Sequence, residues 1–329
     1  MDTTMSSVTI CDIRRAAKRL SGHIVRTPLL ESAMLNQAAA CTVYVKAEPL
    51  QKTGAFKIRG ALNKVLTLDG EVRRRGFVAF SAGNHGLGVA AAAKLVRSPS
   101  VIVLPRNAAR IKVDNCRWWG ADLVFYDPET EDREVVGRGI AKACGMTLIQ
   151  PFDDDDVIAG QGTLGLELCE QMQERGARPD AVLVSCSGGG LSSGVTEAVK
   201  HAFPDSQCYV VEPLGFEKMG RSLASGIPER NSTVPNTIMD AISGPRAGSK
   251  PLSILRRHKV QGLSVSDDEV LHAMAVAFQH LKLVVEPGGA AALAALLADK
   301  ADLNRKTVAV VCSGGNVDPE VFIRALSRS

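Results

Sequence analysis

The sequence lacks long apolar runs, paired cysteines and a signal peptide. No uninterrupted apolar stretch among its 329 residues approaches the roughly 18 that cross a bilayer, so we expect no membrane partner. The eight cysteines include no C-x-x-C pair, and several lie in strand-like apolar runs, where cysteine usually acts as a small buried hydrophobe. The first residues, MDTTMSSVTI, have neither a basic region nor an apolar core. These absences predict a protein of a reducing, cytoplasmic compartment.

Aromatic residues and clustered positive charge are also scarce. Phe, Trp and Tyr make up 4% of the chain, and 39 basic residues stand against 35 acidic ones, a net charge of +4. The basic groups at residues 73–75 and 256–259 are short, and no aromatic platform accompanies them, as a nucleic-acid site would require. We therefore expect no nucleic-acid partner. With 45% apolar residues, the composition is typical of a globular enzyme.

Short β-branched runs alternate with alanine-rich amphipathic segments along the chain. The runs are TVYVKA, FVAF, SVIVLP, DLVFY, MTLIQP, AVLVSC, CYVVEP and TVAVVC. Strand, helix and strand at this spacing predict an α/β fold of parallel sheets covered by helices on both faces. The length allows two such domains or one large unit.

Glycine-rich turns follow three of the expected strands. They are FSAGNHG after residues 77–80, SCSGGGL after 181–184 and CSGGN after 307–311. In an open parallel sheet, the loops beyond the carboxyl ends of the strands line the ligand crevice. We therefore expect the three turns to share one site.

The turn from Ser187 to Leu191 joins a strand to a helix that we expect to begin near Ser192. Its glycines let backbone amides approach an anion, and a helix N-terminus adds about half a positive charge. The turn matches neither the Walker A pattern nor G-x-G-x-x-G, which argues against a nucleotide. Taken alone, it is equally well a tight strand–helix connection.

The SAGNHG turn, residues 81–86, also follows a strand and opens a helix. Its polar residues either start the helix or cradle a carboxylate with exposed amides. His85 as a lone base or metal ligand is the weaker interpretation, because no second ligand stands at a suitable spacing. A serine triad is excluded by the absence of G-x-S-x-G.

Lys57 lies among small and apolar neighbours in TGAFKIRGAL. A lysine in a desolvated pocket has a lowered pKa and can form a Schiff base with an aldehyde. Together with an anion cup and a carboxylate-sized turn, it predicts an enzyme that holds an amino acid against a phosphorylated aldehyde. Pyridoxal 5′-phosphate (PLP) is the cofactor of this kind.

The motifs TGAFKIRGAL, SAGNHG, VIAGQGTLGLE, SCSGGGL, VVEP, TIMDAI, VVEPGGA and CSGGN occur in the order seen in fold-type II PLP enzymes. From about residue 10 to its end, the chain resembles the threonine/serine dehydratase and serine racemase family. The resemblance implies two open parallel-sheet domains of the tryptophan synthase β type, with PLP in the cleft between them. A larger domain of residues 1–69 and 149–329 would enclose a smaller one of residues 70–148, and the enzyme would be a homodimer.

The resemblance also implies roles for individual residues. Lys57 would carry PLP, with Phe56 and Ala241 on opposite faces of its ring. Further residues expected at the cofactor are Asn84 at the phenolic oxygen, Ser313 at the ring nitrogen, Glu286 nearby, and Ser187, Gly188, Gly189, Gly190 and Leu191 at the phosphate. Those expected at the substrate carboxylate are Ser81, Ala82, Gly83, Asn84 and His85, with Arg133 assisting closure.

If Ser313 meets the ring nitrogen, the ring is a weaker electron sink than one paired with an aspartate. Prompt loss of a β-leaving group is then favoured, with Lys57 removing the Cα proton. We therefore predict β-elimination of a β-hydroxy-α-amino acid, such as L-threonine or L-serine, to a 2-oxo acid and ammonia.

Three alternatives stay open. Racemisation needs an acid–base group on the opposite face of Cα, where family racemases have a serine and this chain has Ala82. A dehydratase specialised for 3-hydroxyaspartate or phenylserine is the second, and Arg246 in SGPRAGSK would then meet a distal carboxylate, although an exposed loop arginine is the simpler interpretation. The third is a non-catalytic module that senses an amino acid or PLP.

A divalent cation is doubtful. Several relatives bind one through a glutamate, a carbonyl four residues later and an aspartate six residues later, where this chain has Glu212, Phe216 and Lys218. A protonated lysine is no metal ligand. Either the Lys218 ammonium takes the place of the cation and pairs with Glu212, or it points to solvent and Glu217 supplies a carboxylate.

Overall fold

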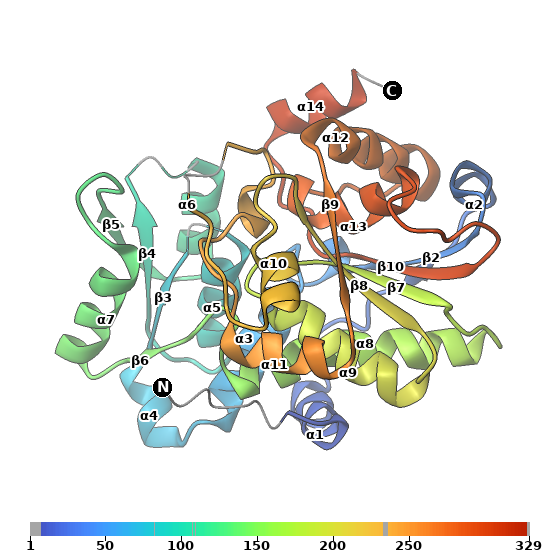
Figure 1. The fold of residues 1–329 in the computed structure, drawn as a ribbon. Helices are drawn as coiled ribbons and strands as arrows, with labels where there is room; N and C mark the ends of the chain where they lie inside the picture. The colour runs from blue at the N-terminus through green and yellow to red at the C-terminus, as the bar shows by residue number, and fades with distance from the viewer. Residues whose placement is uncertain (1–7, 82, 107, 109, 233–235, 328–329) are drawn as a thin grey trace.

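The chain folds around two separate β-sheets, each with helices packed against it (Figure 1). The computed structural model describes residues 8–81, 83–106, 108, 110–232 and 236–327. In the view of Figure 1 the smaller sheet lies on the left and the larger sheet on the right. None of the described helices is long and apolar enough to span a membrane.

The larger sheet has six strands in the order β1-β2-β10-β7-β8-β9. They are β1 (Leu29–Leu30), β2 (Thr42–Ala47), β7 (Ala181–Ser185), β8 (Gln207–Pro213), β9 (Gln261–Val265) and β10 (Thr307–Cys312). β1 runs antiparallel to β2, and the other pairings are parallel. β10 lies in the middle of the sheet, because Val308 pairs with Val43 on one side and with Ala181 on the other.

Side-chain alternation gives this sheet two apolar faces. The helices outside the smaller sheet are α1 (Ile10–Leu20), α2 (Ala33–Ala39), α3 (Lys57–Thr67), α8 (Asp155–Glu174), α9 (Gly190–Ala202), α10 (Lys218–Ser225), α11 (Ser249–Arg257), α12 (Asp267–Val276), α13 (Pro287–Leu297) and α14 (Pro319–Leu326). Val43 and Val308 belong to the core under α2, α12 and α13, while Tyr44 and Ala309 belong to the core under α8, α9 and α11. Shorter turns of helix are η1 (Glu48–Leu50), η2 (Asp240–Ile242) and the π-helical η3 (Ala277–Leu281).

The smaller sheet has four parallel strands in the order β5-β4-β3-β6. They are β3 (Phe77–Phe80), β4 (Ser100–Pro105), β5 (Asp122–Tyr126) and β6 (Thr147–Leu148). Its helices are α4 (Gly70–Arg75), α5 (Asn84–Leu95), α6 (Arg110–Trp118) and α7 (Arg133–Cys144). Phe77 and Ala79 face the core shared with α3 and α5, and Val78 and Phe80 face the core shared with α7.

The predicted α/β fold of parallel sheets is confirmed. Every β-branched run forms a strand, although MTLIQP contributes only Thr147–Leu148. The sequence did not indicate β9, whose segment QGLSV contains glycine and serine, or the two-residue β1. The strands of the smaller sheet fall within residues 77–148; the domain limits at 69/70 and 148/149 stay a prediction.

Close packing of two helices fixes the direction of α3. A Cβ on Gly60 of α3 would lie 2.8 Å from the carbonyl oxygen of Val157 in α8, and one on Gly160 would lie 2.6 Å from that of Arg59. Both distances are shorter than a carbon–oxygen contact allows, so larger side chains would push the helices apart. The two glycines therefore let α3 lie against the backbone of α8, and α3 begins with Lys57.

Candidate active site

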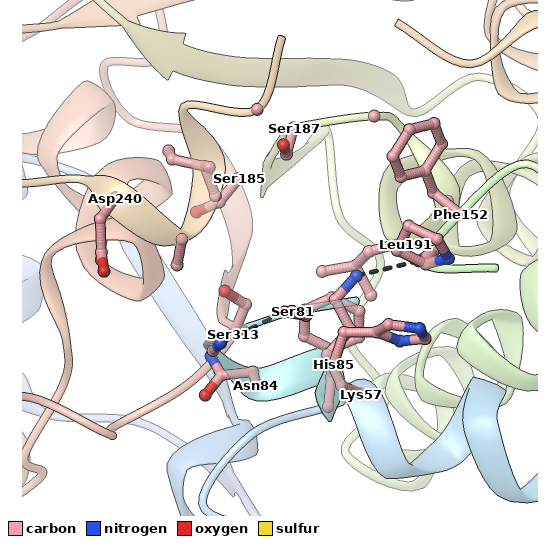
Figure 2. Close-up of a pocket in the computed structure, with 18 of the residues that line it drawn as sticks. Lys57, Ser81, Asn84, His85, Phe152, Ser185, Ser187, Leu191, Asp240 and Ser313 are labelled. Atoms are coloured by element: carbon pink, nitrogen blue, oxygen red, sulfur yellow. Dashed lines mark hydrogen bonds between the residues drawn. The ribbon is translucent and has the colours of Figure 1, made fainter. Parts of the chain in front are cut away.

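A cavity of about 250 Å³ opens where loops from the two sheets meet. Its walls include the loop after β3, the loop after β6, the turn after β7 and the turn after β10. All three glycine-rich turns contribute to it, as their positions after strands predict. Figure 2 shows Ser187 and Phe152 on the upper side of the cavity in that view, with Asn84 and Ser313 below.

Lys57 extends into this cavity from the start of α3. Its Nζ donates a hydrogen bond to the carbonyl oxygen of Pro151 at 2.9 Å and lies 5.2 Å from the centroid of the Phe56 ring. Burial lowers the pKa of Lys57 to about 8, because weakly polar surroundings disfavour the ammonium form. The free amine, which a nucleophile or base requires, is thus far more populated near neutral pH than in a lysine with the ordinary pKa of 10.5.

A buried network of charges anchors the first turn of α3. The Arg59 guanidinium donates to both carboxylate oxygens of Glu48 at 2.8 Å and to Glu167 at 2.7 Å, and Lys46 donates to Glu167 at 2.7 Å. Arg59, Glu48 and Lys46 are fully buried. Burial alone would raise the pKa of Glu167, but Arg59 and Lys46 hold it below the usual value. The network therefore keeps its charges and fixes the backbone two residues from Lys57.

The glycine turn after β7 provides a cradle of backbone amides. α9 begins at Gly190, two residues before the predicted Ser192, so the amides of this turn include those of the first helical turn. Those amides have no preceding helical carbonyl to accept them. A Cβ on Gly188 would overlap the ring of Phe152, and Gly189 adopts φ 95°, which glycine tolerates. The turn fits a phosphate group at the N-terminus of α9.

Asn84, the first residue of α5, is held between two side chains from the larger-sheet part of the chain. Its Nδ2 donates to Glu286 Oε1 at 2.5 Å, and its Oδ1 accepts from Asn316 Nδ2 at 2.8 Å. All three residues line the cavity. Glu286 thus lies beside the predicted cofactor residue Asn84, whereas Asn316 was not singled out by the sequence.

His85 lines the same cavity as Lys57 and is neutral. Its Nε2 donates to the carbonyl oxygen of Ile149 at 2.8 Å, so Nδ1 carries no proton. Burial, together with the positive charges of Lys57 and Arg133, lowers the pKa of His85 to about 3. His85 therefore cannot act as a general acid near neutral pH, which agrees with the sequence-based argument against an acid–base role. No cluster of three potential metal-ligating side chains occurs among the described residues.

The remaining parts of the predicted carboxylate turn are partly described. Ser81 and Gly83 line the cavity, and the Ser81 hydroxyl accepts the amide of Gly83 at 3.2 Å. Ala82 lies outside the described residues, so its role stays a prediction. The predicted cofactor residues Ser187, Leu191, Ala241 and Ser313 also line the cavity.

The two candidate arginines differ in position. Arg133, the first residue of α7, lines the cavity and forms no salt bridge with any described residue. Arg246 does not line the cavity: its guanidinium lies 5.9 Å from the centroid of the Phe152 ring and 4.0 Å from a carboxylate oxygen of Glu134. The loop turns Gly244 and Pro245 toward the cavity and Arg246 to its rim. Arg246 is thus less well placed to meet a distal carboxylate than Arg133.

Lys218 and Glu212 form a buried ion pair. Lys218 Nζ lies 3.3 Å from Glu212 Oε1 and donates to the carbonyl oxygen of Ile242 at 3.2 Å, and both side chains are buried. Glu212 also accepts the amides of Met219 and Gly220 at 3.0 and 2.8 Å. Burial raises the pKa of Glu212, while Lys218 opposes the shift. An ammonium at this place does not fit a divalent cation.

The alternative in which Lys218 points to solvent is wrong. Its side chain is fully buried. Glu217 Oε1 accepts the amide of Gly215 at 2.8 Å. The structure therefore supports the pairing alternative, and metal independence stays a prediction.

The sequence missed several residues of the cavity wall. They include Asn115, Cys116, Pro151, Phe152, Ser185, Asp240 and Asn316. Pro151 and Phe152 follow β6, so their place beyond a strand end was a usable signal. Asn115 and Cys116 lie inside α6, where no local pattern distinguishes a cavity-facing residue from a core residue.

The chain is similar in sequence and structure to known PLP-dependent enzymes. Residues 20–314 match the family described as pyridoxal-phosphate dependent enzyme. The chain is 41% identical to an L-threo-3-hydroxyaspartate ammonia-lyase of Pseudomonas sp., over 96% of this chain and 97% of that protein. The crystal structure of the T.th. threonine deaminase is similar with a TM-score of 0.89 at 40% identity, covering 94% and 99% of the two chains.

The structure of maize serine racemase is also similar, with a TM-score of 0.90 at 35% identity over 98% of each chain. These matches confirm the predicted resemblance and the fold-type II architecture. The amine of Lys57, the amide cradle and the buried hydroxyl of Ser313 fit PLP in chemical type. The chain belongs to the family of pyridoxal-phosphate dependent enzymes.

Proposed function

We propose that the enzyme is an ammonia-lyase that converts a β-hydroxy-α-amino acid to a 2-oxo acid and ammonia. The observation that carries this proposal is the amine of Lys57, with a pKa lowered to about 8, in the same cavity as the amide cradle of residues 187–191. Elimination releases one water, and hydrolysis of the resulting enamine-type product takes one up. The overall reaction therefore balances as amino acid to 2-oxo acid plus ammonia.

PLP, when bound, supplies an electron sink that acidifies the Cα–H bond of an amino acid. The backbone amides of residues 187–191 would hold its phosphate, and Asn84 would donate a hydrogen bond to its phenolic oxygen. Ser313 would offer a neutral hydroxyl to the ring nitrogen of PLP. A carboxylate at that position would stabilise a positively charged ring, whereas a hydroxyl does not. Lys57 takes the Cα proton from one face, while the backbone near Ser81 and Gly83 binds the substrate carboxylate.

We further propose that a dicarboxylic substrate of the L-threo-3-hydroxyaspartate type is preferred. Arg133 supports this choice, because it lines the cavity and forms no salt bridge with any described residue. A second carboxylate on the substrate would supply the missing partner. The name of the Pseudomonas relative points in the same direction. L-Threonine is the second candidate, in view of the similarity to threonine deaminase.

The substrate test compares Arg133→Gln with Arg246→Gln as a matched control. Release of 2-oxo acid is measured for 3-hydroxyaspartate, threonine, serine and phenylserine. Loss of one charge-assisted pair of about 1.5–3 kcal/mol predicts a fall of about 10- to 150-fold in kcat/KM for 3-hydroxyaspartate in Arg133→Gln. Threonine turnover falls less, and Arg246→Gln keeps the wild-type order of preference.

Two results would contradict the substrate proposal. One is an equal loss for threonine and 3-hydroxyaspartate in Arg133→Gln, and the other is a changed order in Arg246→Gln. The absence of 2-oxo acid with every substrate, in protein that has bound PLP, would contradict the lyase itself and favour the sensing module. Chiral analysis of the unreacted substrate tests racemisation, for which Ala82 offers no proton donor.

We also propose that activity is independent of divalent cations. The Lys218 ammonium supplies a positive charge beside Glu212 and the carbonyl oxygen of Ile242. Activity should therefore survive prolonged chelation. A requirement for added Mg²⁺ or Mn²⁺ after chelation would contradict this proposal.

We also propose that the enzyme is a cytoplasmic homodimer. The described cysteines are all free thiols, which is compatible with a reducing compartment. Apolar side chains are exposed over η3 and α14, where Phe278 packs against Phe322 with ring centroids 5.6 Å apart and Ile323 is 62% exposed. A second copy of the chain would cover such a surface. Light scattering of the purified enzyme distinguishes a dimer from a monomer.

A further inference from the structure

Asn316 determines which end of the Asn84 amide faces the cavity. Asn316 Nδ2 donates to Asn84 Oδ1 at 2.8 Å and to the carbonyl oxygen of Thr53 at 2.9 Å. Asn84 Nδ2 donates to Glu286 Oε1 at 2.5 Å. We propose that Asn316 is a positioning residue: it occupies the carbonyl oxygen of Asn84, so that the remaining N–H of Asn84 is presented to a ligand oxygen in the cavity.

The direction of both amides follows from their partners. A reversed Asn84 would bring its carbonyl oxygen against the Glu286 carboxylate and its NH₂ group against that of Asn316. A reversed Asn316 would bring its oxygen against two carbonyl oxygens, those of Thr53 and Asn84. Each reversal leaves like groups facing one another, and a hydrogen-bonding group without a partner costs about 1–3 kcal/mol when buried. The orientation in the structure is therefore the one that satisfies all three side chains.

Two glycines make room for this arrangement. A Cβ on Gly54, which adopts φ 69°, would lie 2.5 Å from Asn316 Oδ1. A Cβ on Gly314 would overlap the Glu286 carboxylate and come within 3.2 Å of Asn84 Nδ2. The backbone is closely held on both sides, because the Gly315 amide donates to the Gly54 carbonyl oxygen at 2.8 Å. The side chains of Asn316 and Glu286 thus occupy space that only glycine leaves free.

The network also joins the two sheets. Asn84 begins α5, which packs on the smaller sheet, whereas Asn316 follows β10 of the larger sheet. Asn316, which follows a strand of the larger sheet, therefore fixes the position of Asn84, which begins a helix of the smaller sheet. Movement of the smaller sheet would pull on this hydrogen bond directly.

The inference rests on the proposed use of PLP, because the ligand oxygen that we assign to Asn84 is the phenolic oxygen of that cofactor. A hydrogen bond to this oxygen stabilises its ionised form, which absorbs at longer wavelength than the neutral form. Loss of Asn316 frees Asn84 to rotate. We expect weaker PLP binding and a larger share of the shorter-wavelength form, with the protein still folded.

The test is a double-mutant cycle on the full-length protein. The variants are Asn316→Ala, Asn84→Ala and the double variant, with the isosteric Asn316→Asp and, as control outside the cavity, Asn231→Asp. PLP affinity is measured by titration of the apoprotein, the visible spectrum is recorded on the holoprotein, and melting temperature reports folding. None of these readouts requires turnover, so they remain informative if the lyase proposal fails.

We expect Asn316→Ala and Asn316→Asp to weaken PLP binding about 10-fold and to shift the spectrum, whereas Asn231→Asp does neither. In the Asn84→Ala background, Asn316→Ala should weaken binding by less than 2-fold, because its effect passes through Asn84. The same loss in both backgrounds would overturn the proposal, as would wild-type affinity and spectrum in Asn316→Asp. If Asn316→Ala melts early, Asn316→Asp replaces it in the cycle.

Discussion

Replacement of Lys218 by methionine should destabilise the protein strongly. The substitution keeps the length of the side chain but removes the ammonium that lies 3.3 Å from Glu212 Oε1. Breaking a buried ion pair in this way leaves one charge uncompensated and costs about 3–5 kcal/mol. Because Glu212 keeps the amides of Met219 and Gly220 as donors and can take up a proton, we expect the lower end, about 3 kcal/mol.

The loss of stability should grow with pH. Burial raises the pKa of Glu212 in the folded protein, and removal of Lys218 takes away a charge that opposes this shift. A carboxyl whose pKa is higher in the folded than in the unfolded chain contributes stability at low pH, and this contribution is lost as the pH rises through the folded pKa. The variant should therefore approach wild-type stability near pH 4–5 and fall furthest behind it in alkaline buffer.

Urea unfolding followed by far-UV circular dichroism measures the effect, with the double variant Glu212→Gln/Lys218→Met as control. Glutamine removes the uncompensated charge, while its carbonyl oxygen still accepts from the amides of Met219 and Gly220, so the double variant should recover most of the lost stability. Wild-type stability in Lys218→Met at pH 8, or an equal loss in the double variant, would refute the reasoning. The two tryptophans, Trp118 and Trp119, lie at the end of α6, so their fluorescence follows the smaller sheet separately.

Three further predictions concern the cavity and its support. Recovery of the visible band when PLP is added to apoprotein should quicken with pH, with a midpoint near pH 8 and a plateau above it, because the lowered pKa of Lys57 sets the share of free amine; a midpoint near the ordinary value of 10.5 would contradict the role of burial. Gly188→Ala should weaken PLP binding at least about 10-fold in titrations, because its Cβ overlaps the Phe152 ring, and unchanged affinity would argue against the amide cradle. Arg59→Lys should lower the free energy of unfolding in urea by about 1–3 kcal/mol, since a compact ammonium cannot reproduce the two parallel hydrogen bonds to Glu48 and also reach Glu167; equal stability would show that charge alone suffices.

The sequence predicted the fold and the meeting of the three turns because both follow from strand order and strand ends. β-branched runs of four to six residues specify strands, and loops at the carboxyl ends of parallel strands necessarily share an edge. Lys57 was identifiable from its small neighbours, since a lysine among glycine and alanine lacks the surroundings of a solvated face. These signals are local in the chain.

The partners of individual side chains were not predictable in the same way. The orientation of Asn84 depends on Glu286 and Asn316, which lie 202 and 232 residues away in the sequence. The burial of Lys218 likewise depends on the carbonyl oxygen of Ile242, which no local pattern places beside it. The sequence gives the charge of each side chain, whereas the direction in which that side chain points is known only from the folded structure.

The central position of β10 has a consequence for the order in which the protein folds. β10 is the last of the described strands in the chain, yet it lies between β2 and β7 in the larger sheet. Until β10 is inserted, the pair β1-β2 and the group β7-β8-β9 are not joined by strand pairing. Ser313 and Asn316 follow it directly. During synthesis, a nascent chain that carries Lys57 and the glycine turn therefore has no complete cleft. Because a ligand stabilises only the state that binds it, PLP should be captured late, by chains whose larger sheet is already closed.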